Sequence, residues 1–244
     1  MGLKGPSPGI KMSSSQNKIA GNACVVTHVF ATGPAQELEE YLRGRVDSLL
    51  FIGHPFSFRP DTRSFYNIYR EGELVKEHKA QKFFLPELFI YLKDFFYTLF
   101  WVIKYPKKID LYVGFDPLNA LSGLFLKKTG KVKRVIFYTI DYVPVRFKNK
   151  LLNSIYRKID IFCAEQADSV WNLSNRINDA RIRAGMRETH NAIVVPIGVN
   201  FQRIKREEER SIDRKTLVYM GFLDKKRGLE FIIEALPDMI GKNP

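Results

Sequence analysis

Two aspartates stand where apolar runs end, Asp116 after residues 110–115 and Asp141 after residues 135–140. Proteins with parallel α/β sheets gather their ligands at the carboxyl ends of the strands, so both side chains are expected to face a cleft. A carboxylate there can accept a proton as a general base or orient a bound hydroxyl. The alternative is a helix cap or a turn. We favour the cap for Asp116, which precedes Pro117, and weigh the two roles equally for Asp141.

A second candidate site follows the short apolar run 217–220, which is long enough for a buried parallel strand and ends at Gly221. A polar turn containing Lys226 and Arg227 then leads into apolar residues at helical spacing, at positions 229, 232, 233 and 236. A strand that ends in glycine and opens into a helix directs backbone N–H groups and the positive helix end at one spot, which favours a phosphate. An ordinary solvated basic turn is the alternative, and the local pattern alone favours it.

The elements that would position these residues alternate between strand and helix. Strands are expected at 23–30, 49–52, 110–115, 135–140 and 169–174, and helices at 36–45, 149–167 and 175–184. This alternation predicts an α/β fold with a Rossmann-like, doubly wound parallel sheet. The first turn lacks the G-x-G-x-x-G fingerprint of dinucleotide-binding proteins. Its Gly33 would allow a ligand to approach closely, although a simple tight turn explains the residue equally well. Residues 55–77 are polar and aromatic, and they are interpreted either as a loop or as a strand pair over the cleft.

The composition restricts the partners and the compartment. The net charge of +13 and the pI of about 9.7 favour polyanions such as an anionic membrane or phosphorylated molecules. No nucleic-acid motif accompanies the charge, so nucleic acid is not an expected partner.

Cys24 and Cys163 lie far apart in apolar runs and are interpreted as buried free thiols of a reducing compartment. The four histidines lack metal-ligand spacing, so no metal site is predicted, and His28 is interpreted as a core residue.

Residues 83–105 form the most apolar and aromatic segment of the chain. Lys93 and Asp94 lie in its middle, and a charge near the bilayer centre costs about 2.5–3.5 kcal/mol, so we do not expect it to span a membrane. A core helix is the favoured interpretation. The alternative is an interfacial helix with its aromatic side chains among lipid headgroups and Lys104, Lys107 and Lys108 beside anionic lipid.

With no apolar signal segment near the start, we expect a cytoplasmic protein, with peripheral membrane attachment as an option.

Three segments together resemble a known family. VVPIGVN at 194–200, followed by LVYMGFLDKKRGLEFIIEAL at 217–236, resembles the domain junction of family 4-type glycosyltransferases of the GT-B fold. EQADSVWNLS at 165–174 is similar to the A-D-x-V-x-x-x-S segment of that family. The chain departs from the family pattern at several positions: Ile197 replaces the usual Asn, Asn200 the usual Asp, Phe222 the usual Arg, and Arg227 the usual Lys. The His that often stands at 139–141 is absent, so its role is not transferred.

The resemblance implies transfer of a sugar from a nucleotide-sugar to the hydroxyl of a lipid-linked or saccharide acceptor, in polysaccharide or glycolipid synthesis. Asp141 would be the catalytic residue. The donor phosphates would bind at Gly221, Lys226 and Arg227, and Gly33, Asp116 and Ser174 would face the acceptor cleft, although Ser174 is an equally good helix cap. The nucleotide-sugar is a co-substrate, and the family generally needs no metal or other cofactor.

The resemblance also implies a domain organisation. We expect a disordered lead-in at 1–20, the acceptor-side Rossmann-like domain at 21–203, a charged linker at 204–215, and the first strand and helix of a donor-binding domain at 216–244. The family's pair of donor-contacting glutamates is not in this sequence, so we expect the chain to be inactive alone, as a fragment or as half of a split enzyme. The alternative is a basic, membrane-peripheral subunit that binds the acceptor and receives its donor domain from a partner.

Overall fold

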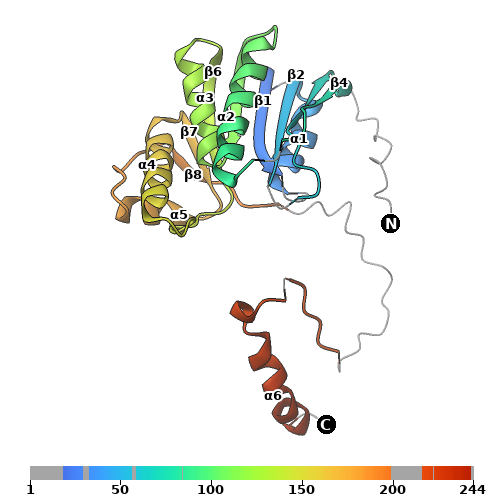
Figure 1. The fold of residues 1–244 in the computed structure, drawn as a ribbon, viewed down its shortest axis with the longest axis vertical. Helices are drawn as coiled ribbons and strands as arrows, with labels where there is room; N and C mark the ends of the chain where they lie inside the picture. The colour runs from blue at the N-terminus through green and yellow to red at the C-terminus, as the bar shows by residue number, and fades with distance from the viewer. Residues whose placement is uncertain are drawn as a thin grey trace. The chain divides into compact units, whose positions relative to one another are not determined.

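The computed structural model describes residues 19–29, 33–56, 59–83, 85–198, 216–221 and 223–242. The chain divides into two units, Met1–Gly198 and Val199–Pro244, which we describe separately (Figure 1). The expected linker at 204–215 and nearly all of the expected lead-in lie outside the described residues. Ala20, the last residue of that lead-in, already belongs to the first strand.

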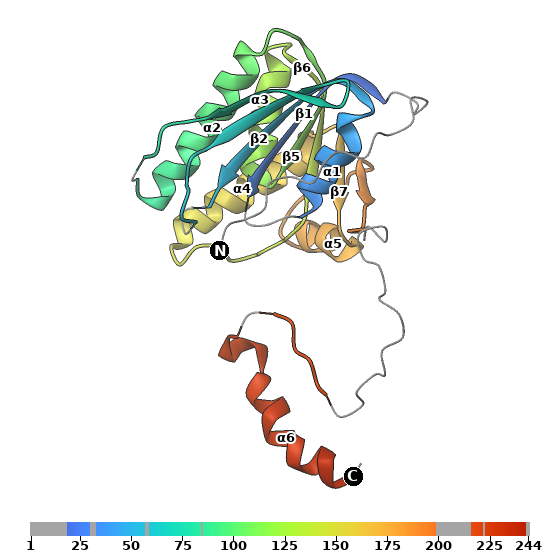
Figure 2. The same ribbon diagram turned by 90° about the vertical axis from the view of Figure 1, so that its right-hand side faces the viewer.

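The first unit is built on one eight-stranded sheet with the order β4-β3-β2-β1-β5-β6-β7-β8. The strands are β1 (Ala20–Val29), β2 (Val46–Pro55), β3 (Phe65–Arg70), β4 (Glu73–Lys79), β5 (Ile109–Phe115), β6 (Val132–Thr139), β7 (Ser169–Asn172) and β8 (Ala192–Val194). The helices of this unit are α1 (Pro34–Arg43), α2 (Glu87–Lys104), α3 (Pro117–Lys128), α4 (Lys150–Gln166) and α5 (Asn175–Arg183). Helices α2, α3 and α4 cover one face of the sheet and α1 lies on the other (Figure 2).

The predicted α/β fold is confirmed, and the sheet is mostly parallel, as expected, with one antiparallel part. Strands β3 and β4 form an antiparallel hairpin beside β2, within and just beyond the segment 55–77, which is thus the strand pair of the two alternatives. Their turn consists of Glu71 and Gly72, both with positive φ, which is the two-residue geometry that matches the twist of paired strands. The side chains of β4 are exposed and mostly charged, and charges on an edge strand discourage pairing with other chains.

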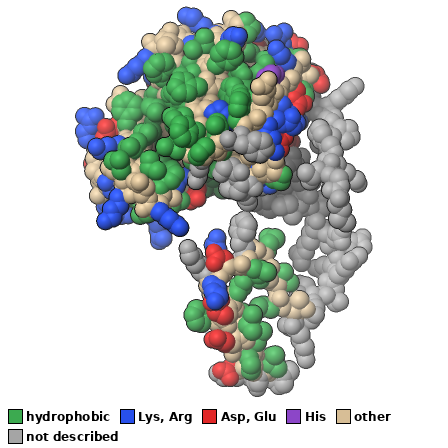
Figure 3. Space-filling view, viewed as in Figure 1, with side chains coloured by type: hydrophobic (Ala, Val, Ile, Leu, Met, Phe, Trp, Pro, Cys, Tyr) green, Lys and Arg blue, Asp and Glu red, His purple; other side chains and the backbone are tan. Residues whose placement is uncertain are grey.

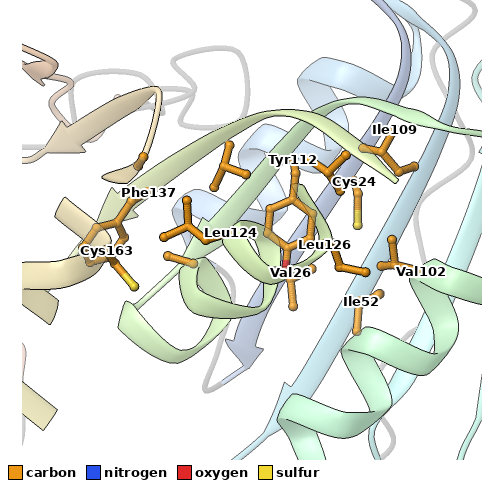
Figure 4. Close-up of a cluster of buried hydrophobic side chains, with 14 of the residues drawn as sticks. Cys24, Val26, Ile52, Val102, Ile109, Tyr112, Leu124, Leu126, Phe137 and Cys163 are labelled. Atoms are coloured by element: carbon orange, nitrogen blue, oxygen red, sulfur yellow. The ribbon is translucent and has the colours of Figure 1, made fainter. Parts of the chain in front are cut away.

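Buried side chains fill both faces of the sheet. The larger cluster lies between the strands and helices α2, α3 and α4, and Figure 4 shows Cys24, Tyr112, Leu126 and Cys163 among its members. Both cysteines are free and buried, as the sequence predicts. Burial raises the pKa of both thiols, which therefore remain protonated within the core.

The contact between β5 and α3 requires a glycine at position 114. A Cβ atom on Gly114 would lie 2.6 Å from the backbone nitrogen of Ala120, in the first turn of α3. Strand and helix backbones therefore approach more closely than any side chain allows. This close approach fixes the start of α3 and, with it, Asp116 between the two elements.

The second unit differs from its expected structure at one element. Residues 216–220 form no strand and are exposed, so the strand expected at 217–220 is absent from the described residues. An extended apolar segment becomes a strand only when a neighbouring strand pairs with its backbone groups. The expected helix is present as α6 (Leu229–Lys242), preceded by a short 3-10 helix at Lys225–Arg227.

Within the described residues, no helix is both long and apolar enough to cross a membrane.

We predict that Gly114→Ala destabilises the first unit. The added methyl group meets backbone atoms that cannot rotate away, so the free energy of unfolding should fall by about 1–3 kcal/mol. Urea unfolding followed by circular dichroism measures the change. Gly44→Ala is the matched control, because a Cβ there meets no atom within 4 Å and its φ of −93° suits any residue. Equal stability of the two variants would contradict the close contact.

Candidate functional site

The candidate site lies where the strand order reverses. Strand β1 pairs with β2 on one side and with β5 on the other, and α/β sheets bind ligands outside the carboxyl ends of strands at such a switch point. A cavity of about 430 Å³ opens there, within the usual size range of small-molecule sites. Its lining comes from four regions: the end of β1 and the start of α1, the segment after β2, the ends of β5 and β6, and the segment from 140 to α4. The lining residues are Thr27, His28, Gly33, Pro34, Ala35, Gln36, Phe56, Phe115, Asp116, Thr139, Ile140, Asp141, Arg146 and Tyr156.

The structure brings three of the predicted site residues together and leaves four elsewhere. Gly33, Asp116 and Asp141 all line the cavity. Ser174 does not line it and occupies the N-cap position of α5 without a side-chain capping bond. The remaining three, Gly221, Lys226 and Arg227, belong to the second unit.

Asp116 has an unusual backbone conformation, and both oxygens of its carboxylate accept hydrogen bonds. Its φ of 72° is a conformation that residues other than glycine rarely adopt. Oδ1 accepts hydrogen bonds from the backbone N–H groups of Leu118 (3.0 Å) and Asn119 (3.1 Å), which confirms the predicted N-cap. Oδ2 lies 2.5 Å from Nδ1 of His28 and accepts a bond from the Asn119 amide (2.8 Å). Strained residues of this kind concentrate at ligand-binding and catalytic sites.

His28 lies between two carboxylates. Its Nδ1 faces Asp116, and its Nε2 lies 3.6 Å from Oδ2 of Asp94, a buried residue of α2. Burial disfavours the charged imidazole, but the two carboxylates outweigh burial and raise the pKa of His28 to about 9. The ring is therefore protonated at neutral pH, so Nδ1 donates to Asp116 while Nε2 directs its proton toward Asp94.

Asp94 extends this cluster into the interior. Its Oδ1 accepts from the Ser64 hydroxyl (2.9 Å) and pairs with the Lys93 ammonium (2.6 Å). Nδ1 of His54 is 3.3 Å from the same oxygen. Burial raises the pKa of the Asp94 carboxyl, but the bonds and charges of the two histidines outweigh that effect and hold it below its usual value. A buried carboxylate surrounded by these donors is stable as an anion.

The cavity lining also carries a cation beside an aromatic ring. Arg146 follows β6 in a loop that Asn153 of α4 holds by accepting from the backbone N–H groups of Arg146 (2.9 Å) and Phe147 (2.7 Å). The Arg146 guanidinium lies over the ring of Tyr156, 5.5 Å from its centroid. The cavity thus presents carboxylates, a guanidinium and aromatic faces to one small volume.

A second buried charge pair supports the β6 edge of the cavity. Arg181 of α5 has an exposed fraction of 0% and forms two bonds of 2.8 Å to the carboxylate of Asp160 in α4. It also donates to Oδ1 of Asn172 (2.8 Å) and to the Thr139 hydroxyl (2.7 Å). One side chain therefore joins α4, α5, β7 and β6, and it fixes Thr139 in the cavity wall.

Sequence reasoning does not identify the residues that hold the site together. It interprets His28 as a core residue, whereas the structure shows that this side chain is both nearly buried and part of the cavity lining. The position of His28 at the carboxyl end of the first strand is the available signal. Asp94 and Arg181 leave no comparable signal, because each depends on a partner that is distant in the sequence: Ser64 is 30 residues from Asp94, and Asp160 is 21 residues from Arg181. Among the described residues, no group of three or more His, Cys, Asp or Glu side chains is arranged to hold a metal ion.

The chain matches none of the protein-family models and none of the curated proteins with which it was compared.

We predict that stability depends on the charge of His28. The pKa of His28 is raised from 6.5 to about 9 on folding, so its contribution is complete below about pH 6.5 and is lost as the pH rises through 9. The total is up to about 3 kcal/mol. Urea unfolding at a series of pH values should show this loss in the parent chain, and His28→Gln should lose less over the same range. If the free energies of unfolding of the two proteins changed with pH in parallel, the protonated state assigned to His28 would be contradicted.

We also predict a large cost for breaking the Arg181–Asp160 pair. Asp160→Ala leaves a guanidinium buried without its counter-charge, so the free energy of unfolding should fall by about 3–5 kcal/mol. Glu165→Ala is the control, because it removes the carboxylate that pairs with the exposed guanidinium of Arg187 and should cost no more than about 1 kcal/mol. Urea titrations of both variants measure the two changes in the free energy of unfolding. Similar changes would show that the buried pair contributes no more to stability than the exposed one.

Proposed function

We propose that the first unit is the acceptor-binding domain of a GT-B glycosyltransferase and that the cavity at the switch point holds the acceptor sugar. The observation that carries the proposal is the meeting of Asp116, Asp141 and Arg146 at the carboxyl ends of β5 and β6. Carboxylate and guanidinium groups suit the hydroxyls of a saccharide, and the rings of Phe56 and Tyr156 offer apolar faces to its carbon skeleton. The resemblance at 165–174, 194–200 and 217–236 supports the same reaction class.

In this proposal the acceptor hydroxyl oxygen bonds to the anomeric carbon of the donor sugar as the bond from that carbon to the nucleotide's phosphate oxygen breaks. The hydroxyl proton passes to Asp141, and the nucleotide leaves with the bonding electrons. Asp141 is suited to the role of base because its side chain is exposed at the cavity, where an acceptor can reach it.

Asp116 and His28 serve as positioning residues. Both carboxylate oxygens of Asp116 already accept hydrogen bonds. His28 is protonated at neutral pH, and its two nitrogens face carboxylates, so it cannot take a proton from the acceptor. Their function is to keep the ends of β1 and β5 and the first turn of α3 in place around the cavity, which a geometrically demanding transfer requires.

The donor phosphates are assigned to the second unit. Gly221, the short helix at Lys225–Arg227 and the start of α6 form a basic segment ahead of a helix amino terminus. Such a terminus favours an anion, and the formal charges of Lys226 and Arg227 add to that preference. This assignment rests on the resemblance and on the local chemistry of the second unit alone.

We predict that the first unit binds a neutral saccharide through Asp141. Saturation-transfer NMR of the full chain with a panel of monosaccharides and disaccharides should identify at least one ligand. Asp141→Ala removes a charged acceptor of hydrogen bonds, so the dissociation constant of that ligand should rise about tenfold or more.

Asp179→Ala is the matched control, since Asp179 is an exposed carboxylate of α5 that does not line the cavity. It should bind the saccharide as the parent chain does. The proposal fails if no saccharide of the panel binds, or if both variants weaken binding equally.

A further inference from the structure

Helix α2 carries an apolar stripe that its own fold leaves uncovered. Its buried side packs on the sheet through residues such as Trp101 and Val102. Six other large apolar side chains of the helix are exposed, with Phe96 at 62% and Phe100 at 50%. The six are Leu88, Phe89, Leu92, Phe96, Phe100 and Ile103.

The spacing of these residues makes one continuous surface. Leu88, Leu92, Phe96 and Phe100 follow each other at intervals of four, which places them on the same side of a helix. Helix α3 packs beside α2 and adds the exposed ring of Phe125. Figure 3 shows hydrophobic side chains gathered on the face of the first unit that α2 and α3 cover. We call this surface, formed by the six side chains of α2 and Phe125, the apolar face.

The exposed charges at the carboxyl end of the apolar face are all positive. Lys104, Lys107 and Lys108 are exposed at the carboxyl end of α2, and the Lys104 ammonium lies 4.3 Å from the centroid of the Phe100 ring. Between residues 88 and 134 the acidic residues are Asp94, Asp110 and Asp116, and none of them is exposed. The apolar face and its basic end therefore have no exposed acidic neighbour within this stretch.

We propose that the apolar face binds the surface of a bilayer that contains anionic lipid. Helix α2 would lie in the plane of the interface, its aromatic rings among the headgroups and the acyl boundary, and its terminal lysines beside lipid phosphates. The charge pattern selects this occupant. A second copy of the chain would offer the same basic patch without exposed acidic groups in this stretch to pair with it. An anionic bilayer supplies both apolar volume and negative charge.

Docking of this kind would bring the cavity close to the bilayer. Tyr91 of α2 lies against His28 in the cavity wall, with 5.6 Å between ring centroids, and Asp94 of the same helix pairs with that histidine. The inference does not depend on sugar transfer, because it rests only on the surface of the first unit.

Co-sedimentation of the full chain with vesicles tests the proposal. Vesicles of phosphatidylcholine with about 30% phosphatidylglycerol should bind the chain, and phosphatidylcholine alone or high salt should weaken binding at least about tenfold. The double variant Phe96→Glu/Phe100→Glu should weaken binding to the anionic vesicles by at least about tenfold, because it places charge where the rings would enter the interface. Its circular dichroism and melting curve should match those of the parent chain.

Phe231→Glu is the matched control, because Phe231 is also an exposed phenylalanine, at 71%, but belongs to α6 of the second unit. This variant should bind vesicles as the parent chain does. If the double variant fails to fold, Lys104→Gln/Lys107→Gln/Lys108→Gln replaces it and should also weaken binding at least about tenfold.

Three results would overturn the proposal. The first is the absence of binding to anionic vesicles at low salt. The second is unchanged binding by the folded double variant, or by the lysine variant where that replaces it. The third is a dimer of the parent chain in light scattering that the double variant converts to a monomer without any vesicle binding, which would assign the apolar face to a second copy.

Discussion

The charge cluster at the end of β1 is the constraint on which the arrangement of the first unit depends. A carboxylate as deeply buried as that of Asp94 is stable only with charged partners and hydrogen-bond donors around it. His28, Lys93 and Ser64 supply them, so the side of α2 that carries Asp94 must face the sheet. The same requirement turns the opposite side of α2, with its aromatic stripe, toward solvent. One buried ion cluster thus determines both the cavity wall and the apolar face.

Two separate groups of polar interactions fix the walls of the cavity. On the β1 side, His28 and the cap at Asp116 connect strand, α2 and α3 through charges of opposite sign. On the β6 side, Arg181 connects two helices and two strands through one guanidinium. Groups held this firmly lose little further freedom when a ligand binds, which favours a preformed site. Asp141, exposed between these supports, is the group that a ligand can reach.

Much of the fold can be predicted from the sequence, because apolar runs and their spacing report directly on strands and helices. The parallel strands and the helices that follow them lie at nearly their expected positions. The β3–β4 hairpin is predicted only as one of two alternatives, since the side chains of β4 are exposed and the turn at Glu71 and Gly72 lacks the usual Asn-Gly or Asp-Gly signal. The strand expected at 217–220 depends on a pairing partner that a local pattern cannot supply.

The candidate site is predictable only in part. Asp116 and Asp141 are found because strand ends are visible in the sequence. The partners of Asp116 are not, because His28 lies 88 residues away and its pairing depends on the strand order. In the sequence Asp94 is a charge that interrupts an apolar segment, and only the folded helix shows which way it points. Contacts between distant residues therefore account for most of what the sequence does not reveal.

The two buried cysteines can be used to measure how often the core of the first unit opens to solvent. Cys24 lies in the central strand and Cys163 in α4, and both belong to the same core cluster. A thiol-specific reagent reaches neither sulfur in the closed protein, so labelling proceeds only as fast as the core exposes them. Equal labelling rates at the two positions would mean that sheet and helix layer separate together. A faster rate at Cys163 would identify α4 as a layer that detaches while the central strands stay paired.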